Sequence, residues 1–209
     1  MQSNKNSMYI KKSNNYKPKH DYLKHYLKLF WFIPSDVLQR GIESNIWNIC
    51  KFKSKVLEIG IGNGEISEFI FRNHPKFAVG IDNEEDGLEL ARTCGKYQKV
   101  MCVNAEKMPF KDGSFNTVVS NSTFEHIKND LKAVSEVGRV LKKNGLFFFT
   151  LPNKNLQDWI YAFEQEKNSS RAKEKLLKFK ERANHRHYRS FSEWEKILKK
   201  NDMEVVFHK

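Results

Sequence analysis

Residues 56–64 read VLEIGIGNG and constrain the fold more than any other part of the chain. The apolar run predicts a buried strand, and Gly60, Gly62 and Gly64 predict a tight loop that no Cβ may crowd. Backbone N–H groups in such a loop can approach a ligand closely. A dinucleotide-binding loop would place its third glycine at Glu65, where a carboxylate is poorly suited to a pyrophosphate. The loop is therefore predicted to bind a different ligand.

The segment after the loop predicts a helix and a second strand. Residues 65–72 have helical periodicity, and the apolar run Phe77–Ile81 ends at Asp82. An acidic residue at this point, about 20 residues beyond the glycines, is where Rossmann-like folds bind ribose hydroxyls. Both hydroxyls can donate to one carboxylate, so we expect Asp82 to hold a ribose beside the loop.

The following region continues the alternation of helices and strands. Helices are predicted at residues 84–93 and 130–141, and strands at Val100–Val103, Phe115–Ser120 and Leu146–Leu151. The second of these helices is expected to end in a cationic turn with a glycine cap at Lys142–Gly145. Such alternation predicts one three-layer α/β unit with a mostly parallel sheet.

The pattern E-x-G-x-G-x-G that starts at Glu58 resembles motif I of the class I S-adenosylmethionine (SAM) dependent methyltransferases, and the downstream landmarks agree over residues 55–153. The resemblance is to the group that includes the ubiquinone-biosynthesis-type (methyltransferase type 11) enzymes. It implies a Rossmann-like fold with helices on both sheet faces, SAM as cofactor and S-adenosylhomocysteine as product. No metal is expected, because no acidic or cysteine residue lies at ligand spacing from the histidines of residues 184–192. Asn104 stands where the family usually has an acidic residue, but its amide oxygen can accept the same hydrogen bond. The cofactor-binding residues implied by the resemblance are Glu58, Gly60, Ile61, Gly62, Gly64, Asp82, Asn83, Asn104, Ala105, Glu106, Ser120 and Asn121.

The segments on either side of residues 55–153 have separate expected roles. Residues 1–19 are polar and predicted to be a disordered basic tail, and residues 20–54 are predicted to form a helical lid over the SAM pocket, with Ser35 capping a helix over residues 36–49. Residues 154–209 are expected to supply acceptor-side helices of the same domain, the last of them capped by Ser192, and a sixth strand at Met203–Phe207.

The sheets of the family that this chain resembles have a seventh strand. We expect it to be absent from this chain or supplied by another, because the sequence stops directly after the predicted sixth strand. An edge is therefore expected to be exposed, and pairing of two copies through it would give a homodimer.

Three residues are candidates for catalysis. His126 follows the predicted fourth strand, near the expected position of the transferred methyl group, and His187 and Tyr188 lie in the stretch HRHYRSFS together with His185. An imidazole can accept the proton of an acceptor hydroxyl. The alternative for each is a structural role, in which these side chains bond to nearby backbone.

The acceptor is the least determined part of the sequence reading. Residues 120–124 read Ser-Asn-Ser-Thr-Phe and differ from the Asn-Pro-Pro-Tyr type that grips the exocyclic amino group of a base. A small-molecule, lipid or sugar acceptor, methylated on oxygen or carbon, is therefore expected. The net charge of +12 lies on the two segments that flank residues 55–153. These basic segments could bind RNA, which is an alternative acceptor, or they could simply be solvated surfaces. A non-catalytic SAM-binding scaffold is the third reading.

The remaining composition favours a cytoplasmic protein. No signal peptide or membrane-spanning run is visible, and the cysteines at positions 50, 94 and 102 lack the spacing of a metal site.

Overall fold

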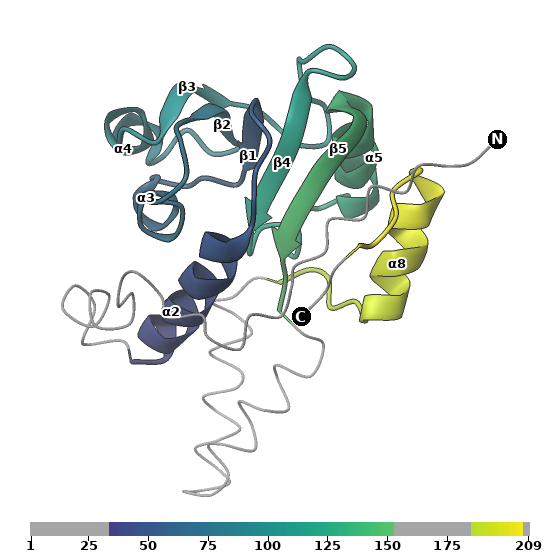
Figure 1. The fold of residues 1–209 in the computed structure, drawn as a ribbon, viewed down its shortest axis with the longest axis horizontal. Helices are drawn as coiled ribbons and strands as arrows, with labels where there is room; N and C mark the ends of the chain where they lie inside the picture. Colours follow the sequence, from purple (N-terminus) through teal and green to yellow (C-terminus); the bar gives the residue numbers. More distant parts are fainter. Residues whose placement is uncertain (1–33, 153–184, 207–209) are drawn as a thin grey trace, which may run out of the picture.

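The computed structural model describes residues 34–152 and 185–206, and these form a single sheet with helices on both faces (Figure 1). The sheet has five parallel strands in the order β3-β2-β1-β4-β5. The elements in chain order are α2 Pro34–Ile49, β1 Val56–Ile59, α3 Glu65–Ile70, β2 Phe77–Asp82, α4 Leu88–Thr93, β3 Tyr97–Cys102, β4 Phe115–Asn121, α5 Asp130–Val140, β5 Leu141–Thr150 and α8 Phe191–Lys200.

The centre of the sheet determines where a ligand can bind. All four residues of β1 are buried, and β1 pairs with β2 on one side and with β4 on the other. The chain therefore reverses its direction of travel across the sheet between β3 and β4. In open parallel sheets the crevice at the carboxyl ends of the strands beside such a reversal is the usual binding site.

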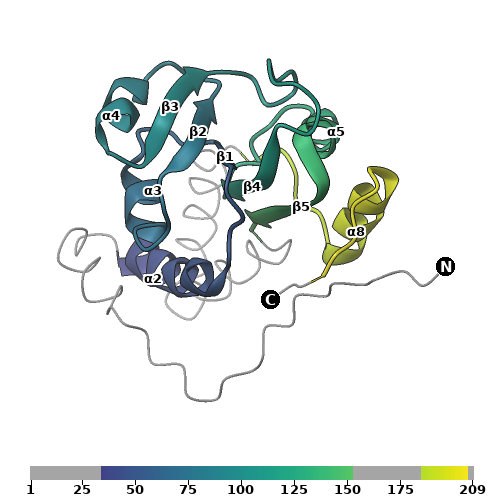
Figure 2. The same ribbon diagram turned by 45° about the horizontal axis from the view of Figure 1, so that its top comes forward.

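Two apolar clusters hold the layers together. The first, which includes Trp47, Phe71 and Leu88, packs on the face covered by α2, α3 and α4. The second, which includes Val134 and Trp194, packs on the opposite face under α5 and α8 (Figure 2). Continuous apolar strands with both faces covered are typical of parallel sheets, and the Rossmann-like α/β prediction is confirmed.

The five strands and the helices between them lie close to their predicted positions, with two differences. Helix α4 begins at Leu88 rather than at residue 84, because Gly87 adopts a left-handed conformation (φ 89°) that a right-handed helix cannot contain. Helix α5 ends at Val140 and the chain becomes extended at Leu141, so the predicted glycine cap is wrong. Lys142–Gly145 instead forms an irregularity within β5, where the register with β4 shifts.

The C-terminal predictions require two corrections. Helix α8 is capped by Ser190 and not by Ser192, because Glu193 lies three residues after Ser190 and completes a capping box. Residues 203–206 of the predicted sixth strand are not in a strand. Met203 and Val205 pack against the cluster under α5 and α8 without joining the sheet, whereas Val206 is exposed. Met203 N–H donates to Leu198 O (3.0 Å).

At the N-terminal side, α2 begins at Pro34, one residue before the predicted cap. The first position of a helix suits proline, because its N–H would have no helical partner there. The predicted tail over residues 1–19, the first part of the predicted lid and the predicted helices within residues 154–184 lie outside the described residues. Within the described ranges, no helix has the length and apolar character that a bilayer crossing needs.

Candidate functional site

The glycine loop and Asp82 meet at the carboxyl edge of the sheet, as predicted. Gly60 N–H donates to Ile81 O (2.8 Å), which fixes the loop to the end of β2. Gly62 N–H donates to Asp82 Oδ2 (2.8 Å), and Glu84 N–H donates to Oδ1 (3.1 Å). The carboxylate is therefore held in place by the backbone, with further lone pairs on both oxygens that can accept from a ligand.

A cavity of about 180 Å³ opens over this loop. It is lined by Arg40, Glu58, Gly60, Ile61, Gly62, Asn63, Ile66, Ser67, Asn121 and Ser122. Most of these residues belong to the loop and to the start of α3. Arg40 comes from α2 and Asn121 from the end of β4, so three separate parts of the chain enclose the cavity.

Glu58 lies beneath the loop at the floor of this cavity. Only 1% of the residue is exposed. Its carboxylate accepts hydrogen bonds from Ser67 Oγ (2.6 Å) and Tyr97 OH (2.9 Å). Burial nevertheless raises the pKa of the Glu58 carboxyl from 4.5 to about 7, and the nearby ammonium of Lys96 offsets this only in part. A cationic ligand group above Glu58 would stabilise the ionised form.

A second cavity lies on the other side of Asp82, beyond the end of β3. It has a volume of about 330 Å³ and is lined by Cys102, Val103, Asn104, Lys107, Met108 and Pro109. Asp82 pairs with Cys102 in the sheet and bonds to Gly62, so it touches the lining of both cavities. An elongated ligand with a central diol would fit this arrangement.

The other predicted cofactor-binding residues near the second cavity mostly make hydrogen bonds to nearby parts of the chain. Asn104 Oδ1 accepts from Glu106 N–H (2.8 Å), and Glu106 Oε1 accepts from Asn129 N–H (3.0 Å). Ala105 is buried, and the exposed Asn83 accepts a weak bond from the Cys102 thiol through its carbonyl (3.6 Å). Asn104 lines the second cavity, and its carboxamide has remaining hydrogen-bonding capacity.

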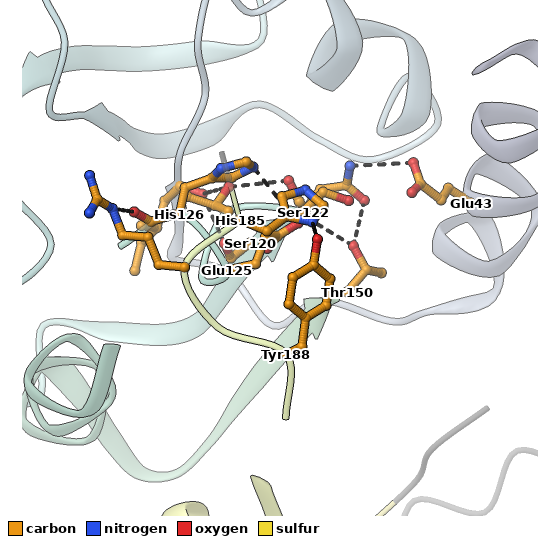
Figure 3. A network of polar contacts seen from close by, with 12 residues as sticks. Glu43, Ser120, Ser122, Glu125, His126, Thr150, His185 and Tyr188 are labelled. Atoms are coloured by element: carbon orange, nitrogen blue, oxygen red, sulfur yellow. Dashed lines mark hydrogen bonds and ion pairs between the residues drawn. The ribbon is translucent and has the colours of Figure 1, made fainter. Parts of the chain in front are cut away.

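The two residues predicted at the end of β4 have different positions. Ser120 is fully buried, and its hydroxyl donates to Ile59 O (3.1 Å), which ties β4 to β1. Asn121 reaches the cavity and joins α2 to β5: its Oδ1 accepts from Trp47 Nε1 (2.8 Å) and Thr150 Oγ1 (2.9 Å). Figure 3 shows this network extending from Asn121 to Glu43.

The predicted catalytic residues lie in the same region but divide into two groups. His126 and His185 face one another, with ring centroids 4.8 Å apart, and His185 Nδ1 is 2.9 Å from the Tyr188 hydroxyl (Figure 3). The pKa of His185 is lowered by burial and by the charge of His126. Glu125 lies beside them and is only 1% exposed, and burial raises its carboxyl pKa to about 7.

His187 has a different environment. Its Nε2 bonds to Ile127 O (3.0 Å), and Arg189 forms a bidentate ion pair with the buried Asp130 (2.8 Å for each bond). Arg186 N–H also donates to Glu125 O (2.7 Å). These contacts attach residues 185–190 to the loop between β4 and α5, and they favour the structural alternative for His187.

Comparison with known proteins identifies this architecture. Residues 57–149 match the methyltransferase domain model of the type 11 family. Residues 57–149 therefore form a SAM-dependent methyltransferase domain. The ubiquinone biosynthesis O-methyltransferase of Neisseria meningitidis is 27% identical to this chain over 69% of the chain and 57% of its own length. An uncharacterised protein of Methanocaldococcus jannaschii is 33% identical over 73% of the chain and 62% of its own length.

A solved SAM-dependent methyltransferase of Thermotoga maritima has the same fold, with a TM-score of 0.59 and 20% identity over 87% of this chain and 80% of that one. This chain spans about three fifths of the length of the two curated relatives.

Sequence reasoning missed several residues of this candidate site. Arg40 and Glu43 pair on α2 (2.6 Å), and Arg40 faces the first cavity. Nothing in the helical periodicity of residues 36–49 distinguishes a lining arginine from a solvated one. Glu125 was also missed as a buried acid, although it lies next to His126 at the end of a predicted central strand, where a polar residue has functional significance more often than elsewhere.

Proposed function

We propose that this chain transfers a methyl group from SAM to an oxygen or carbon atom of a small-molecule, lipid or sugar acceptor. The observation that carries the proposal is the pair of cavities joined by Asp82. The first cavity contains the cationic Arg40 and the buried carboxylate of Glu58. Between the cavities, the carboxylate of Asp82 can accept hydrogen bonds from a diol, and the second cavity has an apolar surface with the amide of Asn104. SAM presents a zwitterionic amino acid, a ribose and an adenine in the same order.

Each part of SAM has a matching group in this arrangement. The Arg40 guanidinium is placed to bind the ligand carboxylate, and Glu58 lies below the expected position of the ammonium group. Asp82 would accept from the ribose hydroxyls. Met108 would contact the adenine face, and Asn104 its edge. The glycine loop allows the backbone to approach the methionyl part closely.

The reaction that follows is a direct displacement. A lone pair of the acceptor atom attacks the methyl carbon, the C–S bond breaks, and its electron pair stays on sulfur to give S-adenosylhomocysteine. For a hydroxyl acceptor, the proton leaves to a base. His126 is placed for this role, because it lies at the exit of β4 with 41% of its side chain exposed. Since the methyl group is already activated, the protein mainly supplies orientation.

Calorimetry with SAM tests the donor site. Asp82→Asn removes the charge that faces the ribose, and we expect SAM to bind about 10- to 100-fold more weakly, which corresponds to about 1.5–3 kcal/mol for hydrogen bonds to a charged group. Glu89→Gln is the matched control, because Glu89 is an exposed carboxylate on α4 that pairs with Arg92 (3.2 Å). Equal affinity of both variants for SAM would contradict the proposed site.

A methyl-transfer assay over hydroxyl, carbon, amine and RNA acceptors tests the acceptor class. We expect turnover on a hydroxyl or carbon acceptor that changes little with salt. Transfer to RNA with a steep loss at higher salt would instead support a nucleic-acid acceptor, because phosphate contacts are salt-dependent. SAM binding without turnover on any of these acceptors would favour a scaffold.

A further inference from the structure

Three potential metal ligands from two distant segments meet beside the proposed acceptor site. Glu125 and His126 belong to the loop that leaves β4, and His185 precedes α8 (Figure 3). One ligating atom of each residue lies within 4.8 Å of the other two. Glu125 Oε1 is 4.0 Å from His126 Nε2. Glu125 and His126 are adjacent, and His185 lies in a different segment. This arrangement does not match the spacing of metal-ligand motifs, so no metal was expected from the sequence.

Glu125 provides a second, independent observation. The residue is 99% buried, and among the described residues its Oε2 has no hydrogen-bond partner. A buried carboxylate oxygen without a partner is costly to the fold unless a proton or a cation neutralises it. The nearby Arg40 and Glu43 pair with each other (2.6 Å), so neither supplies the missing partner of Glu125 Oε2. A bound cation would supply it.

The histidine from the second segment is held in an orientation suited to a metal. His185 Nδ1 lies 2.9 Å from Tyr188 OH, so Nε2 is the nitrogen that we assign to the metal. Metal-binding histidines almost always engage their other ring nitrogen in this way. The backbone bond from Arg186 to Glu125 O (2.7 Å) fixes the segment against the loop that carries the other two ligands.

We propose that Glu125, His126 and His185 bind a divalent transition metal ion, of which Zn²⁺ fits best. Two imidazoles and one carboxylate form the ligand set of many catalytic zinc sites, which keep a further position open. Imidazole ligands disfavour Mg²⁺ and Ca²⁺, which prefer oxygen. With metal–ligand bonds of about 2.1 Å, tetrahedral ligand atoms lie about 3.4 Å apart. The partly exposed His126 can rotate to close the present separation.

The ion has a function that rests on the proposed methyl transfer. Its open position would accept the oxygen of an acceptor hydroxyl and lower the pKa of that hydroxyl, so that the nucleophile is formed at neutral pH. The ion would then replace His126 in activating the acceptor. Asn121, the last residue of β4, lies four residues before Glu125 and lines the SAM cavity, so the metal would lie close to the donor. Acceptors with an oxygen that can coordinate a metal are the substrate class that this site selects.

Metal binding can be measured without turnover. Tag-free full-length protein is stripped with a chelator and titrated with Co²⁺, whose visible absorption reports coordination by nitrogen, and then with Zn²⁺ in calorimetric competition. We expect one ion per chain. His126→Ala and His185→Ala should each weaken binding by about 100-fold or more, and Tyr188→Phe by about 10- to 100-fold, because it removes the group that orients His185.

His187→Gln is the matched control. His187 lies in the same segment but bonds to Ile127 O, and glutamine keeps a donor for that carbonyl. We expect its Zn²⁺ affinity to remain within about threefold of the wild type, and circular dichroism checks that every variant is folded. SAM affinity is measured on the same samples, so that failure of the SAM site is recognised separately. No stoichiometric Zn²⁺ in wild-type protein that binds SAM, or undiminished Zn²⁺ binding in His126→Ala and His185→Ala, would overturn the proposal.

Discussion

Two glycines of the same loop should respond very differently to substitution by alanine. Both have positive φ angles, +79° at Gly60 and +50° at Gly62. A Cβ at Gly62 would meet nothing within 4 Å, whereas a Cβ at Gly60 would lie 2.1 Å from Thr123 Oγ1 and 2.6 Å from Thr123 Cβ. The side chain of Thr123 therefore distinguishes the two positions.

The free energies of unfolding follow from these contacts. An alanine in the left-handed region costs about 1–2 kcal/mol, which is the whole expected loss for Gly62→Ala. Gly60→Ala adds the overpacking of a close contact, about 1–3 kcal/mol more, for a total of about 2–5 kcal/mol. Urea denaturation of the two variants and of the wild type measures both values.

A third substitution tests whether Thr123 is the cause. Thr123→Gly removes all three side-chain atoms that the new Cβ would meet. In a double-mutant cycle, Gly60→Ala should therefore be less destabilising by about 1–3 kcal/mol in the Thr123→Gly background. Equal losses for Gly60→Ala and Gly62→Ala, or a cycle with no coupling, would show that the packing of β1 against the exit of β4 has been misread.

Three further changes are expected to alter stability. The folded-state pKa of Glu58 is raised from 4.5 to about 7, so the native state binds more protons than the unfolded chain in this range, and stability should fall as pH rises from about 5 to 8. The free energy of unfolding should change by at most about 3 kcal/mol over this range. Glu58→Gln should flatten this pH dependence when the free energy is measured by urea unfolding at each pH. An unchanged pH dependence would exclude Glu58 as its source. Arg189→Ala should cost about 3 kcal/mol, because it leaves Asp130 buried (2% exposed) without its bidentate partner; a loss below about 1 kcal/mol in urea denaturation would indicate that solvent replaces the pair. Ser190→Ala should cost about 1 kcal/mol by loss of the α8 cap, seen as a lower thermal midpoint, whereas Ser192→Ala should have little effect.

The parts of the fold that the sequence predicted are those with a local physical cause. The glycine loop, the strands of the sheet and the position of Asp82 follow from apolar periodicity and from backbone conformations that few residues adopt. The errors occur where two local signals compete. Ser190 and Ser192 are both plausible caps, and only the spacing to Glu193 decides between them. Met203 and Val205 alternate as in a strand, but packing against the cluster under α8 satisfies the same pattern without a sheet partner.

The donor side and the acceptor side of the site differ in how far sequence can predict them. The donor side depends on one continuous motif and on residues at strand ends, which the order of the chain places at one edge. The proposed acceptor side is assembled from the exit of β4 and the segment before α8, and no periodicity relates these two. Helix α2 adds Arg40 to the donor cavity, which the motif does not predict either. His126 was selected for its position after a strand, yet its proposed chemistry also depends on His185, which only the fold brings close to it. Because Arg186 and Arg189 dock that distant segment through backbone and carboxylate contacts, a sequence that lost them would keep the SAM motif and lose the acceptor site.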